Sequence, residues 1–334
     1  MKKWWLLFLC ALGISTAWYV FYPKRGDETQ AISALPHEQT PHEPKHLKET
    51  YGPYFFSVPI LKFSLAQIPS LMVQVEGRDI MVELDLGLRG EASFSQEVIK
   101  NIREKTLVGE RTMYGARGKS YRTSRYKAPQ IHIVNLDIRG CIMEEESEEF
   151  LLDSVFLTSA DTHRRKHSGR IGWELFATCN LFLDLANSRI AFCDSAETLE
   201  NQGYPMQEFA KTPLHTERGF IEMLVEGSEG IQMWALDTGT TWNIVNAHDN
   251  TKTVEEMALD PSNHIELPLK IGNADFGLLS FCRIPIPLPI HVDAMLGMEF
   301  FKTHQVFIDF YEQQIYVSKP LKNAKQSVPG NIPQ

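Results

Sequence analysis

Two segments of the sequence have an aspartate directly after apolar residues and shortly before a glycine. Residues 237–240 read Asp-Thr-Gly-Thr and follow Trp-Ala-Leu, and residues 85–87 read Asp-Leu-Gly at the end of an apolar segment that begins at Met81. This order of residue types predicts a buried strand that ends in a tight turn. A buried carboxylate is costly unless it is hydrogen-bonded or shares its charge. Asp85 and Asp237 are therefore candidates for acid–base chemistry.

The sequence around the two aspartates repeats. Residues 170–176 align without a gap with residues 295–301, and each segment is followed by an apolar strand that ends in aspartate. Gly172 and Gly297 both lie 12 positions before that aspartate, and a Val-Glu-Gly lies upstream of both acidic turns. The repeat indicates two β lobes related by a pseudo-twofold axis, each bringing one aspartate to a shared cleft.

These residues resemble the motifs of the retropepsin-like and pepsin-like aspartic proteases. In that family an apolar residue and Asp-Thr/Ser-Gly are followed by an apolar-apolar-Gly element that crosses beside the Asp strand, and then by a strand that ends the lobe. Residues 236–239, 295–297 and 306–310 follow this order. The resemblance implies a mostly β, bilobal aspartic-protease-like fold. It also implies hydrolysis of peptide or protein substrates with no cofactor and no metal.

The resemblance assigns roles to residues of both turns. Asp85 and Asp237 would form a catalytic dyad that holds one proton, because two close carboxyls cannot both ionise cheaply. One carboxylate would take a proton from water while the other carboxyl donates a proton to the substrate carbonyl. The supporting residues of the active-site loops would be Gly87, Thr238, Gly239, Thr240, Gly172 and Gly297.

The first site departs from the family pattern. Leu86 has no hydroxyl to help lock the two loops together, and Leu88-Arg89 stands where a small residue is usual. Three interpretations follow: an intramolecular dyad, a second lobe that acts with its copy in another chain, or a non-catalytic relative that binds peptides or assembles at the cell envelope. A buried Asp85 with no catalytic or structural role would only destabilise the fold. This favours the first interpretation, an aspartic endopeptidase that is a monomeric pseudo-dimer.

A polar, glycine-containing segment lies between Asp85 and Gly172. This interval is 27 residues longer than its counterpart in the second half, and residues 111–121 within it are typical of a protruding hairpin. The segment resembles the flap of the aspartic proteases, with Tyr114 and Gly115 near its tip. An ordinary exposed hairpin is the alternative.

Composition and the N-terminal segment indicate where the folded part acts. The 334 residues are 43% hydrophobic, enough for two domains with cores, and the net charge of −9 argues against nucleic-acid binding. A basic start and an apolar run over residues 4–22 indicate a cleaved signal peptide or an uncleaved anchor that holds the protein to a membrane. In both cases the folded part is expected outside the cytoplasm, in the periplasm if the protein is bacterial.

The patterns divide the chain into six segments. We expect a signal peptide or membrane anchor (1–25), a polar linker (26–50), the first lobe (51–196), an interlobe linker (197–218), the second lobe (219–318) and a polar tail (319–334). Within the first lobe, residues 94–102 are expected to form a short helix, and the acidic residues 144–149 a solvated loop. Of the five cysteines, Cys179 and Cys193 are the first pair to test for a disulfide if the compartment is oxidising.

Overall fold

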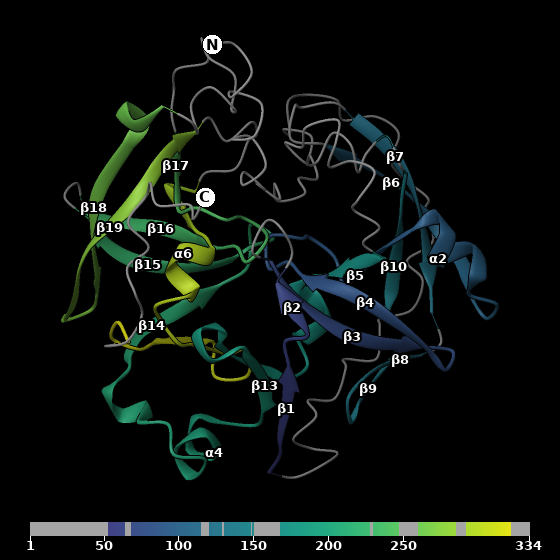
Figure 1. Ribbon diagram of the computed structural model, residues 1–334, viewed down its shortest axis with the longest axis horizontal. Helices are drawn as coiled ribbons and strands as arrows, with labels where there is room; N and C mark the ends of the chain where they lie inside the picture. The colour runs from purple at the N-terminus through teal and green to yellow at the C-terminus, as the bar shows by residue number, and fades with distance from the viewer. Residues whose placement is uncertain are drawn as a thin grey trace, which may run out of the picture.

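The computed structural model describes residues 53–63, 68–114, 120–128, 130–147, 149, 168–227, 230–246, 260–284 and 292–321. The protein is mostly β, with two large sheets and a few short helices, in agreement with the predicted bilobal class (Figure 1). The blue strands of the first half gather on one side, and the green strands of the second half on the other. Within these described ranges, no helix has the length and apolar character needed to cross a bilayer. The predicted signal or anchor segment lies outside them.

The smaller sheet belongs to the first half of the chain. In spatial order it contains β6 (Thr106–Tyr114), β7 (Ser120–Lys127), β10 (Ile142–Glu146), β5 (Ala92–Ser95), β11 (Gly169–Ile171), β4 (Arg78–Leu84), β3 (Pro69–Val75), β8 (Gln130–Ile133) and β9 (Leu136–Arg139), with β2 (Lys62–Phe63) beside β3. The Val-Glu-Gly upstream of Asp85 forms the turn between β3 and β4. Glu76 and Gly77 both have positive φ there (50° and 73°), as a two-residue type I′ hairpin turn requires.

The larger sheet contains strands from both halves. In spatial order these are β1 (Phe55–Pro59), β13 (Arg189–Cys193), β12 (Asn180–Asp184), β21 (Val306–Asp309), β22 (Gln314–Val317), β14 (Ala210–His215), β15 (Ile221–Gly227), β16 (Gly230–Leu236), β20 (Ala294–Leu296), β17 (Ile244–Asn246), β19 (Ala274–Ile284) and β18 (His264–Ile271). The halves meet where β12 pairs antiparallel with β21. Phe182 lies opposite Phe307, its own counterpart in the repeat, so an approximate twofold axis passes between these two strands.

The helices are short and lie mainly at strand ends. Those in the described ranges are α2 (Gln96–Asn101), α4 (Ala196–Asn201) and α6 (Met298–Phe301), with 3₁₀ helices η2 (Trp173–Phe176), η3 (Leu185–Asn187), η4 (Met206–Glu208) and η5 (Pro261–Asn263). The helix predicted over 94–102 is α2. It begins later than predicted because Phe94 belongs to β5 and the Ser95 hydroxyl caps the helix by accepting from Val98 N. The predicted interlobe linker contains α4, η4 and β14, and β14 joins the larger sheet.

Two sequence predictions differ from the structure. Residues 142–146 form strand β10, and Glu144 and Glu146 are buried, so a solvated loop is the wrong description of this part of the acidic segment. Arginine partners explain the burial, because Arg111 lies 3.0 Å from Glu144 and Arg170 lies 2.8 Å from Glu146. The pair of cysteines proposed for a disulfide, Cys179 and Cys193, are separate buried thiols.

One hydrophobic core extends through both halves and holds the strand ends that precede the acidic turns. Leu84 and Leu86 on the first side and Trp234 and Leu236 on the second are fully buried in it. Burying a side chain of this size stabilises the fold by roughly 1.5–3 kcal/mol. Packing of the apolar residues next to each aspartate thus fixes where the two aspartates lie.

Candidate active site

The two acidic turns occupy equivalent positions in the two halves. Asp85 follows β4 and its N–H donates to Ile171 O of the parallel strand β11, at 3.0 Å. Asp237 follows β16 and its N–H donates to Leu296 O of the parallel strand β20, also at 3.0 Å. The strand that ends at Gly172 or Gly297 therefore lies beside the Asp strand in each half, as the repeat predicts.

Gly172 and Gly297 end these crossing strands where the acidic loops pass closest. A Cβ on Gly172 would lie 2.6 Å from Leu88 O, and one on Gly297 would lie 2.9 Å from Thr240 O. A side chain at either position would push the loop away from its strand. The two glycines thus allow close packing of the loops.

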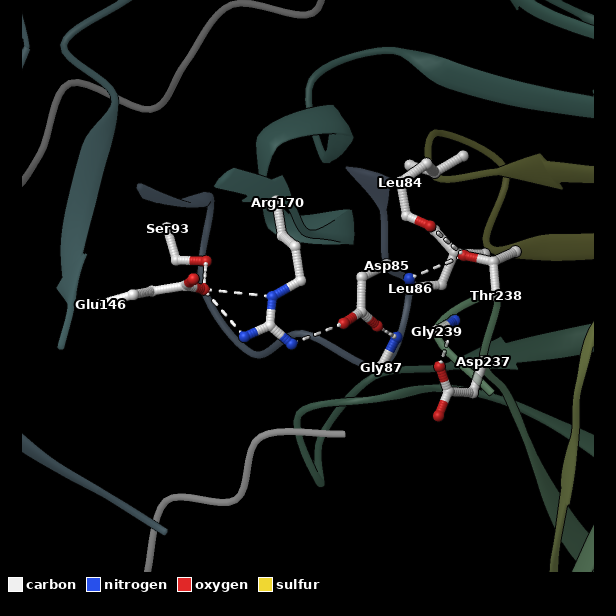
Figure 2. A network of polar contacts seen from close by, with 10 residues as sticks. All are labelled: Leu84, Asp85, Leu86, Gly87, Ser93, Glu146, Arg170, Asp237, Thr238 and Gly239. Atoms are coloured by element: carbon white, nitrogen blue, oxygen red, sulfur yellow. Dashed lines mark hydrogen bonds and ion pairs between the residues drawn. The ribbon is translucent and has the colours of Figure 1, made fainter. Parts of the chain in front are cut away.

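The side chains of Asp85 and Asp237 lie close together within one chain (Figure 2). A Cβ on Gly87 would lie 2.5 Å from Asp237 Oδ1, and a Cβ on Gly239 would lie still closer to the carboxyl of Asp85. Each glycine N–H also donates to the aspartate of its own turn, Gly87 N at 3.0 Å from Asp85 Oδ1 and Gly239 N at 2.7 Å from Asp237 Oδ1. Both turns need glycine here because any side chain would displace the opposite carboxyl.

Burial sets the protonation of Asp237. Asp85 and Asp237 are 0% and 1% exposed. Burial raises the pKa of Asp237 well above its ordinary range, and the charge of Asp85 raises this pKa further, while the N–H of Gly239 acts in the opposite direction. Burial and the neighbouring carboxyl therefore both oppose ionisation of Asp237.

Thr238 ties the two turns together. Its hydroxyl donates to Leu84 O at 2.8 Å and accepts from Leu86 N at 3.0 Å, so one buried side chain in the second half bonds to both sides of Asp85. Leu86, the counterpart of Thr238, is instead buried in the core. Thr240 supports its own loop, since its carbonyl accepts from Met298 N at 2.8 Å.

A buried network beside Asp85 was not predicted from the sequence. Arg170 Nη1 lies 3.4 Å from Asp85 Oδ2, while Arg170 Nε and Nη2 lie 3.1 and 2.8 Å from Glu146 Oε1 (Figure 2). The Ser93 hydroxyl donates to the same Glu146 oxygen at 2.5 Å. One signal was available, because Arg170 stands where the repeat has the apolar Met295. Within the described part of the chain, no group of three or more His, Cys, Asp or Glu residues is arranged to hold a metal ion.

The hairpin predicted between Asp85 and Gly172 is formed by β6 and β7. Tyr114 ends β6, and Gly115 lies outside the described residues. Met113 and Tyr121 pack with Leu88, and Arg111 Nη2 donates to the carbonyl of Arg89 at 2.6 Å. The hairpin therefore rests on the loop that follows Asp85, and its role as a flap stays a prediction.

The fold and the paired turns define a bilobal, pepsin-like architecture. No protein-family model matches the chain, and no curated protein matches its sequence. Among solved structures, conglutin gamma, a basic 7S globulin from lupine seeds, aligns with a TM-score of 0.55 over 80% of this chain and 95% of its own, at 9% identity. Basic 7S globulin from soybean aligns over the same shares with a TM-score of 0.52, also at 9% identity. These globulins have the pepsin-like aspartic protease fold, and at this identity the likeness shows the fold alone.

Proposed function

We propose that the protein is an aspartic-type endopeptidase in which Asp85 and Asp237 of one chain activate a water molecule. The main support is the packing of the two turns, in which each glycine lies against the opposite carboxyl and two buried carboxyls share one small space. The folded part would act outside the cytoplasm, on peptide or protein substrates and as a monomer.

The site has groups for both proton transfers of amide hydrolysis. The raised pKa of Asp237 favours its protonated form, the form that can donate to the carbonyl oxygen of the scissile amide. Asp237 Oδ2 is buried and has no hydrogen-bond partner among the described residues, so it is an unsatisfied acceptor that a bound water molecule or substrate group would satisfy. An ionised carboxylate would take a proton from the water as its oxygen attacks the carbonyl carbon. The resulting tetrahedral diol would collapse as the amide nitrogen accepts a proton and leaves.

A second candidate is a non-catalytic protein that binds peptides or takes part in assembly. Leu86 and the cation beside Asp85 favour it, because both depart from the pattern of a symmetric dyad. The two similar structures are also those of basic 7S globulins. Such a protein would keep its affinity for peptides when Asp237 becomes Asn.

Peptide-library hydrolysis by the full chain in detergent, between about pH 3 and pH 7, tests the proposal. Replacing either Asp85 or Asp237 by Asn should lower the rate by roughly 10²–10⁴-fold, the usual contribution of one acid–base group. Asp309→Asn is the matched control, because this buried acid lies outside the site and its Oδ1 accepts from the backbone N–H of Glu312, which an amide oxygen can also do. Its rate should stay near that of the parent.

The outcomes separate the candidates. Loss of activity with Asp237→Asn alone would indicate a second-lobe site that acts with its copy in another chain. Folded protein that hydrolyses no peptide at any pH, yet binds peptides before and after Asp237→Asn, would support the non-catalytic candidate.

A further inference from the structure

The two halves differ at one position that faces the dyad. Arg170 in β11 lies opposite Glu83 in β4, two residues before Asp85. Met295 in β20 lies opposite Ala235 in β16, in the same place relative to the second aspartate. The first aspartate therefore has a guanidinium as its neighbour, and the residue at the equivalent position of the second half is an uncharged methionine.

The guanidinium of Arg170 is held in a fixed orientation. Its side chain is 4% exposed, and two of its three nitrogens bond to one oxygen of Glu146, which also accepts from Ser93. Because a guanidinium is planar, fixing two nitrogens also fixes the direction of the third. That nitrogen, Nη1, points to Asp85 Oδ2 at 3.4 Å, and Arg170 lies between Glu146 and Asp85 (Figure 2).

The other charges around the site do not cancel this asymmetry. The charged groups on the elements around Asp85 include Glu83 on β4, Arg89 in the loop after Asp85, Glu144 and Glu146 on β10, Arg111 on β6, Arg125 on β7, Arg170 on β11 and Asp237 in the second half. Glu144 is paired with Arg111 at 3.0 Å and Arg125 at 3.5 Å. Glu146 offsets part of the charge of Arg170, but the cation lies closer to Asp85 than Glu146 does. Opposite charge at this distance favours the ionised carboxylate.

We propose that Arg170, held by Glu146, fixes the negative charge of the dyad on Asp85, so that Asp85 is the general base and Asp237 the general acid. This inference rests on the proposed hydrolytic function. Asp85 takes the proton of the attacking water and passes it to the amide nitrogen as the C–N bond breaks. Asp237 gives its proton to the carbonyl oxygen and regains one from the diol when the carbonyl re-forms. Arg170 acts through Asp85 and is a positioning residue.

A titration that needs no turnover tests this assignment. Aspartates carrying ¹³C at the carboxyl carbon would be followed by NMR in the full chain in detergent, with Asp85→Asn and Asp237→Asn to assign the signals. We expect the Asp85 carboxyl to remain ionised to lower pH than the Asp237 carboxyl. Arg170→Met, which copies the second half, should move the Asp85 transition to higher pH by about 1 unit or more. Arg170→Lys should restore part of the difference.

The pH–rate profile gives a second measurement if peptides are hydrolysed. The acid limb of the profile should move to higher pH in Arg170→Met by the same amount as the NMR transition. A purely structural role for Arg170 would lower the rate without moving this limb. Arg170→Met leaves Glu146 buried without its cation, so the double variant Arg170→Met/Glu146→Leu is the alternative if the single variant does not fold.

The outcomes distinguish this inference from the proposed function. If the parent hydrolyses no peptide, the proposed function fails, while the NMR titration still decides which carboxyl is ionised. The assignment is overturned if Asp237 ionises at lower pH than Asp85. It is also overturned if the folded Arg170→Met protein, or the double variant in its place, titrates at Asp85 as the parent does.

Discussion

At the scale of single residues, the site depends on one hydroxyl that joins two loops. Thr238 bonds to Leu84 O and Leu86 N, and both backbone groups are buried. Thr238→Val keeps the shape of the side chain but leaves these two groups without their partner, which should cost about 1–3 kcal/mol. Thr238→Ser keeps the hydroxyl and should cost less. Urea unfolding of the three proteins measures the difference, and equal losses for Val and Ser would contradict the proposed link.

The site residues that could be predicted from the sequence are those at positions where only a few residue types are possible. Asp85, Asp237 and their glycines could be predicted because a buried acid at a strand end and a close approach of backbone permit few residue types at fixed spacing. The partnership of Arg170 and Glu146 could not, because these residues lie 24 positions apart and only the sheet brings them together. An ion pair between strands leaves no periodic pattern in the chain.

At the scale of elements, the β6–β7 hairpin lies over the loop after Asp85 through a small apolar cluster. Met113→Ala would remove most of the side chain that packs on Leu88 and Tyr121, so we expect the hairpin to open more often. Backbone amides of β6 and β7 should then exchange hydrogen roughly 10-fold faster or more, since about 1.4 kcal/mol corresponds to a factor of ten. Thr112→Ala, at an exposed position of the same strand, is the control. Unchanged exchange in Met113→Ala would show that the cluster does not hold the hairpin.

Helices and strands could be predicted from the sequence where their local residue pattern agreed with their environment in the fold. The hairpin and α2 have local signals in their turn and cap residues. Strand β10 does not, because its sequence Ile-Met-Glu-Glu-Glu is typical of a solvated segment. Its two inward carboxylates are stable only because arginines from β6 and β11 reach them. Such tertiary compensation overrides local preference.

At the scale of the whole molecule, the shared sheet and the shared core predict one unfolding transition. Asn180 bridges the halves, because its Oδ1 accepts from Phe310 N at 2.9 Å and its Nδ2 donates to Asp194 O at 3.0 Å. Asn180→Ala should lower the melting temperature by several degrees while the transition stays single. Asn201→Ala, at an exposed position, should change it little. Calorimetry measures both, and two resolved transitions in the parent would contradict the prediction.

Buried acids also predict how stability depends on pH. Burial raises the pKa of Glu144, Glu222 and Glu299 to about 7, so their unfolded forms ionise at lower pH than their folded forms. The stabilisation of the folded state that results from these raised pKa values is complete below about pH 4.5. It is lost as the pH rises through 7. His304 opposes this between about pH 4 and 6.5, because burial lowers its pKa to about 4.

The net result should be a melting temperature that falls between about pH 6 and pH 8. Glu222→Gln should flatten this fall and raise the melting temperature at pH 8 by a few degrees. Glu200→Gln, at an exposed position, is the matched control. A parent melting temperature that rises over this interval would contradict the sign derived from the buried acids.

Phe182 pairs with Phe307 on the approximate twofold axis, so the two halves are arranged like the subunits of a homodimer but within one chain. This arrangement bears on how far the sequences of the two halves can differ. If two identical chains met along this axis, every residue would appear twice, and an arginine at position 170 would draw both carboxyls toward ionisation. No proton would then be left to donate. Joining the halves in one polypeptide removes that constraint, because each half can change alone. The differences at Arg170 and Leu86 would then give the two halves different roles, which two identical chains could not have.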